Sequence, residues 1–418
     1  MKILYISFAV QHPKLPGSTR QYHLMKELVN NHEVTLLALG QKEVSSDILS
    51  DLATLAKSVL IIPARPLYKE EKRISKWSKA VQHRKACMKM RRAVDDLLRA
   101  DEFDAIVFHG KTVYPAIEHL KDVPIVADFC DASSLRISSE LKRTSPKRLP
   151  FLLYRYLKMR RIEKRLLRQT PYQAFISSRD RQAIAGENAL YDVIPNGIDL
   201  EFWRSSGKNQ EPHDLSLIFT GVMSFKPNHE AALYLLQHIA PAINKTFKSA
   251  RILVVGKDPQ KQIVELGQEH PNITVTGYVP DIRSFLASAS VFVAPIQAAS
   301  GMQNKILEAM AMQIPVVTSP NVADGIAIDG HDLPVLVAKT KDEYIKHIET
   351  LLSDNRLRER MGIAGLRYVR AHFNWTKSAN LLEQLLINAK NDPRWKNREL
   401  HQEKIWSRKL HSPMLSEK

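Results

Sequence analysis

The amino-acid sequence predicts an α/β protein made of two doubly wound domains in tandem. The chain has 418 residues, which is more than one ordinary hydrophobic core organises. Short apolar runs alternate with helical stretches, and this plan occurs twice, with the turn-forming sequence PNGID (195–199) between the two halves. The runs are apolar on both faces. Each half is therefore expected to contain a parallel sheet with helices on both sides.

The first half opens with KILYISFA (2–9), a short run rich in Ile and Tyr that predicts a strand. Residues 18–31 place apolar side chains at helical spacing and predict a helix. Similar apolar runs predict further strands at 32–39, 58–64, 103–110, 124–131 and 172–178.

The second half repeats the plan from LSLIFTGV (215–222) onward, with helical stretches between the runs. The tail from about residue 391 is polar and weakly patterned, which is compatible with disorder or with a helix on the surface. Apolar runs predict the remaining strands at 250–257, 272–279, 290–296, 314–319 and 333–338.

The composition restricts the class of protein. Cys87 and Cys130 follow no metal-ligand spacing, so we expect two free thiols of a reducing compartment and no zinc site. The N-terminus lacks the pattern of a secretory signal, and no run of about 18 apolar residues predicts a membrane span. We therefore expect a cytoplasmic protein. The net charge of +17 favours an anionic partner.

The positive charge gathers in two segments. Residues 142–168 hold eleven basic residues and one acid, Glu163, and residues 65–92 hold eleven basic residues and two acids. Two readings stay open for these segments: a patch on an anionic membrane surface, formed by 65–92 and 142–168, or a solvated helix whose apolar stripe packs on its own domain. No nucleic-acid-binding motif supports specific nucleic-acid binding. The predicted stripe consists of Tyr156, Met159, Ile162, Leu166 and Leu167.

The sequence ASGMQNKILEAMAMQIPVV (299–317) predicts a ligand site. It follows a predicted strand, and open α/β sheets bind ligands beyond the carboxyl ends of their strands. A helix N-terminus attracts phosphate, Gly301 permits a close backbone approach, and Lys305 adds a positive charge. Glu308 suits a ribose diol as a hydrogen-bond acceptor. Alternatively, it only complements the helix dipole.

Several motifs together resemble glycosyltransferase family 4. They are NKILEAMAMQIPVV, VIPNGIDLEFW (193–203), LIFTGVMSFKPN (217–228), VTGYVPDIRSFLASASVFVAP and the C-terminal RLRERMGIAGLRYVRAHFNWTKSANLLEQLL. The resemblance spans about residues 1–390. It implies the GT-B fold, two Rossmann-like domains facing a central cleft, and a retaining, metal-independent transferase. It implies an acceptor domain at 1–195 completed by a helix at about 375–390, a donor domain at 196–374, and a basic tail at 391–418.

The resemblance assigns the donor-side residues. Glu308 matches the glutamate that holds the ribose, whereas Ser300 replaces the glutamate that contacts the donor sugar. Val222 stands where the family has an arginine of the diphosphate clamp. Lys226 matches the clamp lysine, and Lys305 is expected to supply the missing charge. The donor-binding residues predicted in the loop and helix are Ser300, Gly301, Met302, Gln303, Lys305 and Glu308.

The first half supplies the remaining predicted site residues. LPGSTRQ (15–21) resembles the family's glycine loop, and Arg20 is expected to reach the same anion as that loop. His109 ends a strand where the family often has a histidine near the reacting sugar. Asp128 and Asp131 follow the next strand as hydroxyl ligands or a general base, or merely as N-caps. In the glycine loop, the predicted donor ligands are Gly17 and Ser18.

The function predicted by the resemblance is transfer of a sugar from a nucleotide-diphosphate sugar to a glycan or lipid-linked acceptor. A subgroup found in bacterial exopolysaccharide clusters has a similar G-x-Q-N-K-x-L-E-A-M-A loop. Ser300 and Val222 keep an alternative open, a degenerate GT-B protein that binds nucleotide or polyanion without catalysis. Another GT-B chemistry, such as epimerisation of a sugar nucleotide, is a further alternative.

Overall fold

Two parallel sheets organise the computed structural model, which describes residues 1–15, 19–40, 44–64, 76–121, 123–186, 192–204 and 215–395. The chain divides into two compact units. Unit 1 comprises Met1–Phe129, Ile162–Ala174 and Ala379–Lys418, and unit 2 comprises Cys130–Arg161 and Phe175–Ser378.

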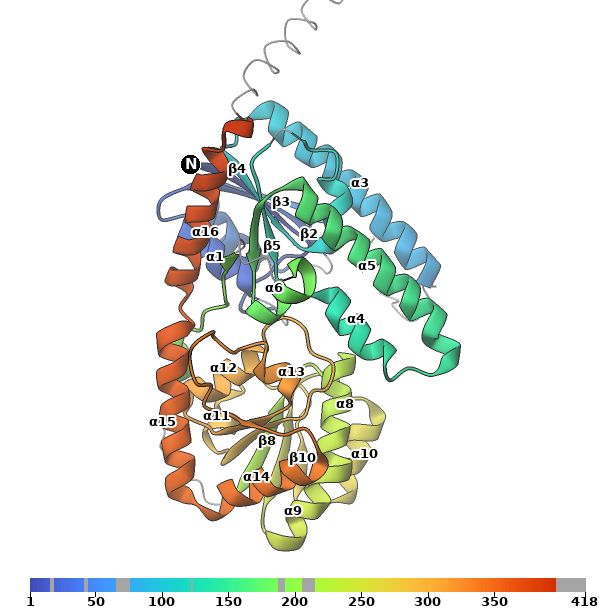
Figure 1. Cartoon of the computed structure of the whole chain (residues 1–418), viewed down its shortest axis with the longest axis vertical. Coiled ribbons are helices and arrows are strands. Elements are labelled where there is room, and N and C mark those ends of the chain that lie inside the picture. The colour runs from blue at the N-terminus through green and yellow to red at the C-terminus, as the bar shows by residue number, and fades with distance from the viewer. Residues whose placement is uncertain are drawn as a thin grey trace, which may run out of the picture. The chain divides into compact units, whose positions relative to one another are not determined.

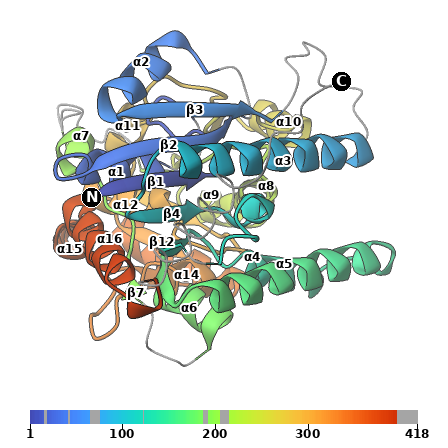
Figure 2. The same ribbon diagram turned by 90° about the horizontal axis from the view of Figure 1, so that it is seen from above.

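The first sheet has seven strands in the order β3-β2-β1-β4-β5-β6-β7. Figure 2 shows β3, β2, β1 and β4 side by side in this order. The register pairs Ile3 of β1 with Val34 on one side and with Ala105 on the other, and all these pairs are parallel. The six strands predicted for this half are confirmed, and only the two-residue β7 was not predicted. The strands are β1 (Lys2–Ser7), β2 (Glu33–Gly40), β3 (Ser58–Pro63), β4 (Ala105–His109), β5 (Ile125–Phe129), β6 (Tyr172–Phe175) and β7 (Asp192–Val193).

Helices connect these strands, as right-handed parallel connections require. The predicted helix at 18–31 is confirmed as α1 (Arg20–Leu28). The other helices up to β7 are α2 (Ser46–Leu55), α3 (Lys76–Ala100), η2 (Lys111–Ala116), α4 (Ser133–Leu141), η3 (Pro146–Arg148), α5 (Leu149–Gln169) and α6 (Ser178–Ala185).

The second sheet has six parallel strands in the order β10-β9-β8-β11-β12-β13, and it confirms the six strands predicted for the second half. The observed strands are shorter than predicted, and three of them end directly before Gly221, Gly256 or Pro295. The strands are β8 (Ser216–Thr220), β9 (Arg251–Val255), β10 (Ile273–Val275), β11 (Val291–Ala294), β12 (Val316–Thr318) and β13 (Leu336–Val337).

Helices flank the second sheet (Figure 1). Helix α14 begins with a capping box, in which Thr340 accepts a hydrogen bond from the Glu343 amide and Glu343 caps in return. The helices are α7 (Leu200–Arg204), α8 (Lys226–Tyr234), η4 (Leu235–Ile239), α9 (Ala240–Thr246), α10 (Lys261–Glu269), α11 (Arg283–Ala287), α12 (Asn304–Ala311), α13 (Pro320–Ala323), α14 (Lys341–Ser353), α15 (Asn355–His372), α16 (Trp375–Lys390) and η5 (Pro393–Trp395).

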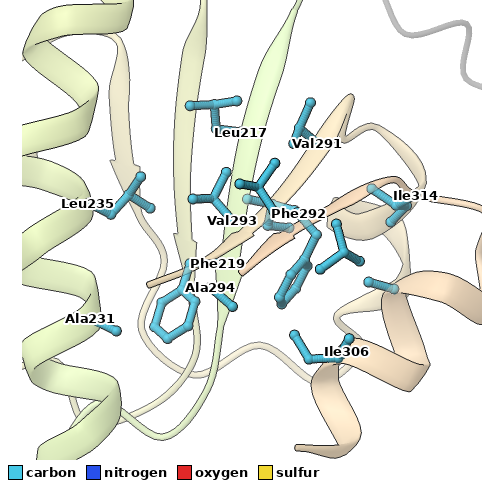
Figure 3. Close-up of a cluster of buried hydrophobic side chains, with 14 of the residues drawn as sticks. Leu217, Phe219, Ala231, Leu235, Val291, Phe292, Val293, Ala294, Ile306 and Ile314 are labelled. Carbon is cyan, nitrogen blue, oxygen red and sulfur yellow. The ribbon is translucent and has the colours of Figure 1, made fainter. Parts of the chain in front are cut away.

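The core of unit 2 lies between the second sheet and its helices. Figure 3 shows Leu235 on one side and Ile306 on the other, with Phe292 of β11 among the side chains between them. All three are fully buried. Each buried large apolar side chain contributes about 1.5–3 kcal/mol, so this packing fixes α12 firmly against the sheet. Residue 304, where α12 begins, is thereby held near the carboxyl end of β11.

Three further expectations from the sequence concern the tail, the thiols and membrane spans. Residues 396–418 of the predicted basic tail lie outside the described residues. Cys87 and Cys130 are free thiols, as predicted. Among the described residues, no helix combines the length and the apolar character that spanning a bilayer requires.

Candidate functional site

Glu308 is a carboxylate on α12 that has no hydrogen-bond partner among the described residues. It lies on α12, between apolar neighbours that are fully buried, and is itself half-buried. Within the described part of the chain, its carboxylate makes no hydrogen bond and no ion pair. Burial raises the pKa of Glu308 from 4.5 to about 7, and the nearby Lys305 opposes this rise. An acceptor of this kind is suited to a ligand hydroxyl.

Lys305 lies on the same helix and reaches the end of β8. Its Nζ donates to Asn228 Oδ1 at 2.7 Å and lies 4.7 Å from the centroid of the Phe219 ring. A methyl group added at Gly221 would lie only 2.8 Å from this nitrogen. Burial lowers the pKa of Lys305 from 10.5 to about 7, and Glu308 opposes the change. The ammonium group therefore lies beside the residue that precedes Val222.

Two glycines form the backbone around this end of the sheet. Gly221 and Gly256 have φ angles of +155° and +143°. A Cβ atom at Gly256 would lie 1.9 Å from the Gly221 carbonyl oxygen, so only glycine allows this approach. Asn228 holds the next turn, because its Nδ2 donates to the Val222 carbonyl at 3.0 Å. The sequence analysis did not identify Asn228, although it occurs in the quoted motif LIFTGVMSFKPN.

Lys226, the predicted clamp lysine, begins α8 and is 53% exposed. Its Nζ lies 3.6 Å from a Glu140 oxygen and 3.5 Å from a Glu230 oxygen. The pair with Glu230 is exposed, and exposed ion pairs contribute little to stability, so Lys226 can exchange Glu230 for an anion.

The loop before α12 is held by two aspartates of unit 2. Ser300 Oγ donates to Asp131 Oδ2 at 3.2 Å, and the Gly301 amide donates to Asp180 Oδ1 at 3.1 Å. Gly301 has a φ of +65°, and a Cβ there would lie 2.9 Å from the Cys130 carbonyl oxygen. The need for glycine at this position thus follows from packing within the protein.

Asp180 was not identified from the sequence. It is fully buried on the first turn of α6. Its Oδ1 also accepts from the Ala132 amide, which places Asp180 between the loop after β5 and the loop before α12. Met302 packs against the core of unit 2, and Gln303 Nε2 donates to the Ser300 carbonyl at 3.4 Å. The only sequence signal for Asp180 was its place three residues after Ser177, which caps α6.

A second cluster lies in unit 1 at the ends of β4 and β5. His109 Nδ1 lies 2.7 Å from Asp128 Oδ2, and Arg20 Nε donates to the same oxygen at 3.0 Å. These three side chains are buried completely or nearly so. Burial alone would raise the pKa of Asp128, yet the Arg20 guanidinium and the His109 ring hold it well below its usual range. The structure thus brings three of the predicted residues together.

The tautomer of His109 follows from its second partner, Gln11. The Gln11 Oε1 accepts the Gln21 amide at 2.9 Å, so its Nε2 is the donor that faces His109 Nε2 at 2.8 Å. His109 therefore carries its proton on Nδ1 and donates it to Asp128. Because all these groups are already paired, Asp128 is poorly suited to act as a general base. The cluster fixes the chain that leads into and out of the predicted glycine loop.

The remaining predicted residues have different outcomes. Gly17 and Ser18 lie outside the described residues. Asp131 is not an N-cap: α4 is capped at Ala132 without a side-chain bond, and Asp131 instead accepts from the Ser133 hydroxyl at 2.8 Å. The alternative that Asp128 and Asp131 are merely N-caps is therefore wrong. Among the described residues, no group of three or more His, Cys, Asp or Glu side chains is arranged to hold a metal ion.

Comparison with known proteins matches part of the chain to a family model. Residues 214–354 match the family model described as glycosyl transferases group 1, and this range contains Asn228, Lys305 and Glu308. An uncharacterized glycosyltransferase of Methanocaldococcus jannaschii is 25% identical over 235 residues. That match covers 52% of this chain and 58% of the relative, so the chain spans little more than half the length of that relative.

Solved structures match nearly the whole chain. HepE of Anabaena, crystallised with UDP and glucose, has a TM-score of 0.63 and 15% identity, covering 92% of this chain and 99% of that one. Sucrose-phosphate synthase of Thermosynechococcus elongatus has a TM-score of 0.67 and 16% identity, covering 91% and 98%. The chain therefore has the GT-B fold of glycosyltransferases, with two Rossmann-like parallel sheets.

Proposed function

We propose that this protein is a glycosyltransferase that moves a sugar from a nucleotide-diphosphate sugar to a glycan or lipid-linked acceptor. One observation carries the proposal. Lys305 and Glu308 lie on one helix at the carboxyl end of a parallel sheet. Lys305 lies beside the glycine turn after β8, and Glu308 has no hydrogen-bond partner in the described part of the chain. A cation and an acceptor in this arrangement suit the diphosphate and the ribose of one ligand.

The diphosphate would lie against Lys305 and the N-terminus of α12. Among the described residues, no side chain caps this helix. The Ile306 amide donates to the Gln303 carbonyl, so the amides of Asn304 and Lys305 are the ones that an anion can use. An incoming diphosphate stabilises the protonated form of Lys305, whose pKa burial has lowered to about 7. Lys305 would thereby supply the positive charge of the family's clamp arginine, whose position Val222 occupies here. Lys226 would contribute a second, exposed charge.

The transferred sugar would be oriented by the loop around Ser300. Ser300 lacks the carboxylate that the family resemblance predicts there, but the carboxylate of Asp131 lies 3.2 Å from its hydroxyl group. We therefore assign sugar-hydroxyl recognition to Asp131 and Ser300 together. Charge-assisted hydrogen bonds of this kind contribute about 1.5–3 kcal/mol each.

The transfer would proceed with retention and without a metal. In a front-face route, the leaving diphosphate takes the proton of the acceptor hydroxyl, so the protein needs no strong general base. The paired state of Asp128 is compatible with this route. The protein then contributes positioning and stabilisation of charge on the departing phosphate. We place the reaction in the synthesis of a surface polysaccharide, because the G-x-Q-N-K-x-L-E-A-M-A loop resembles that subgroup, and we expect it to take place in the cytoplasm.

The donor base is tested by thermal shift with UDP, GDP, ADP and CDP. HepE was crystallised with UDP, which makes uridine the first choice. At about 100 times Kd, the correct nucleotide adds roughly 2.7 kcal/mol of stability. Glu308→Ala should lose this gain, whereas Glu265→Ala, an exposed glutamate on α10, should keep it. If none of the four nucleotides stabilises the protein, the donor site is wrong.

A second candidate function, nucleotide binding without catalysis, is favoured by the substitutions at Ser300 and Val222. An assay with a sugar nucleotide that carries the base found by thermal shift distinguishes the two functions. Release of nucleoside diphosphate that depends on an added glycan or lipid extract supports transfer. Binding without turnover of any donor supports the non-catalytic protein, and a free altered sugar nucleotide points to epimerisation.

A further inference from the structure

The first half of α5 exposes a dense group of large apolar side chains. Tyr154 is 62% exposed, Leu157 57% and Phe151 55%. Leu149 and Leu153 are exposed as well, so nine consecutive residues hold five of the fourteen exposed large apolar side chains in the described part of the chain. Scattered exposed apolar residues are normal on protein surfaces, but such a concentration on one segment marks an interaction surface.

The predicted apolar stripe of α5 is a different face of the helix. Leu166 of that stripe is buried, and Leu152 and Glu163 are buried on the same side. The helix therefore packs on the protein through Leu152, Glu163 and Leu166, and it carries a second apolar group that is exposed.

The exposed group continues into positive charge along one face. Leu153, Leu157 and Arg161 follow each other at intervals of four residues, as do Tyr154 and Lys158. Arg161 and Lys158 are exposed. Residues 141–162 contain eight basic residues and no acid. The outward face is thus apolar in its first turns and basic in the next.

We propose that this face of α5, residues 149–161 with the basic residues 142–148 before it, docks on an anionic lipid bilayer. Aliphatic and aromatic side chains enter the acyl boundary while Lys and Arg remain at the headgroups. A second copy of this chain would fit poorly, because a symmetric contact would oppose eight positive charges with eight more. Nucleic acid would match the charge but would leave the five apolar side chains uncovered.

The inference does not rest on sugar transfer and is tested by binding alone. The full chain is sedimented with phosphatidylcholine vesicles, with and without phosphatidylglycerol, at low and high salt. We expect binding only to the anionic vesicles, weakening with salt. Lys158→Gln with Arg161→Gln should weaken binding about 25-fold, at about fivefold for each charge. Leu153→Ser with Leu157→Ser should remove the part of binding that resists high salt.

Matched variants control for general effects. Lys341→Gln with Lys346→Gln removes two exposed charges from α14, and Ile363→Ser removes an exposed apolar side chain from α15. These should change binding less than twofold, and melting temperatures check that every variant folds. The proposal is overturned if the wild type ignores anionic vesicles at low salt, or if the control variants lose as much binding. It is equally overturned if the α5 variants abolish self-association or double-stranded RNA binding while vesicle binding persists.

Discussion

Replacing Glu308 by glutamine should stabilise the empty protein at alkaline pH while weakening its hold on nucleotide. In the folded chain burial raises the pKa of Glu308 from 4.5 to about 7. Between these values the folded state binds a proton that the unfolded state has released, so stability falls as pH rises. Above pH 7 the buried charge is present and its full cost remains. Glutamine has nearly the same shape and never carries that charge.

The magnitude follows from the shift. One pKa unit corresponds to about 1.4 kcal/mol, so the shift of Glu308 corresponds to at most about 3 kcal/mol at pH 8. Lys305 offsets little of this above pH 7, because burial lowers its pKa to about 7 and it loses its own charge there. At pH 5 the carboxyl is largely protonated, and glutamine should then be nearly neutral in its effect.

Urea unfolding of wild type and Glu308→Gln at pH 5 and pH 8 measures the difference. We expect the variant to gain stability at pH 8 and little at pH 5. As a control, Glu343→Gln should lower the stability at pH 8, because Glu343 caps α14 and backbone hydrogen bonds lower its pKa. An equal gain at both pH values, or a loss at pH 8, would refute the reasoning. Glu308→Gln should also bind its nucleoside diphosphate about tenfold more weakly than the wild type, because a charged hydrogen-bond acceptor is lost.

Three further outcomes are expected. Asp128→Asn leaves the Arg20 guanidinium buried without its carboxylate and should cost about 3–5 kcal/mol in urea unfolding; a loss below about 1 kcal/mol would contradict this. Gly256→Ala places a Cβ 1.9 Å from the Gly221 oxygen, and backbone strain of about 1–3 kcal/mol should lower the melting temperature; an unchanged value would show that the turn adapts. Lys305→Met should weaken nucleoside diphosphate binding about tenfold at pH 6 and less at pH 8, where the wild-type amine is largely neutral. If calorimetry shows the same loss of affinity at both pH values, the positive charge that binds the diphosphate is not that of Lys305.

The strands of both sheets could mostly be predicted from the sequence, because most of them lie within largely apolar runs. Buried parallel strands carry their signal locally, and even the three-residue β10 lies within the longer strand that was predicted at 272–279. Strand β7 escaped prediction because it has only two residues, one of which, Asp192, is exposed. Some predicted strands extend too far at their carboxyl ends. The predicted strand 124–131, for example, contains the residues that pair in β5 and also residues 130–131, which already belong to the loop after β5.

The candidate site was harder to predict from the sequence than the sheets, because the residues that contact each other in it are distant in the sequence. Lys305 and Glu308 were identified, being on one helix with a recognisable motif. The partner of Lys305, Asn228, lies 77 residues away, and the partner of His109, Gln11, lies 98 residues away. Amide side chains are common on surfaces, so nothing local marks these two. Their role arises only where the strand ends of a parallel sheet meet at one edge.

The opposite shifts of Lys305 and Glu308 also explain why the site is kept in an unfavourable state. Each side chain is buried enough to disfavour its charged form, and Glu308 lacks the hydrogen bonds that would compensate. A diphosphate beside Lys305 and a hydroxyl pair beside Glu308 would remove both penalties at once. Ligand binding would then recover free energy that the empty fold has lost, so affinity for the donor and instability without it have one cause.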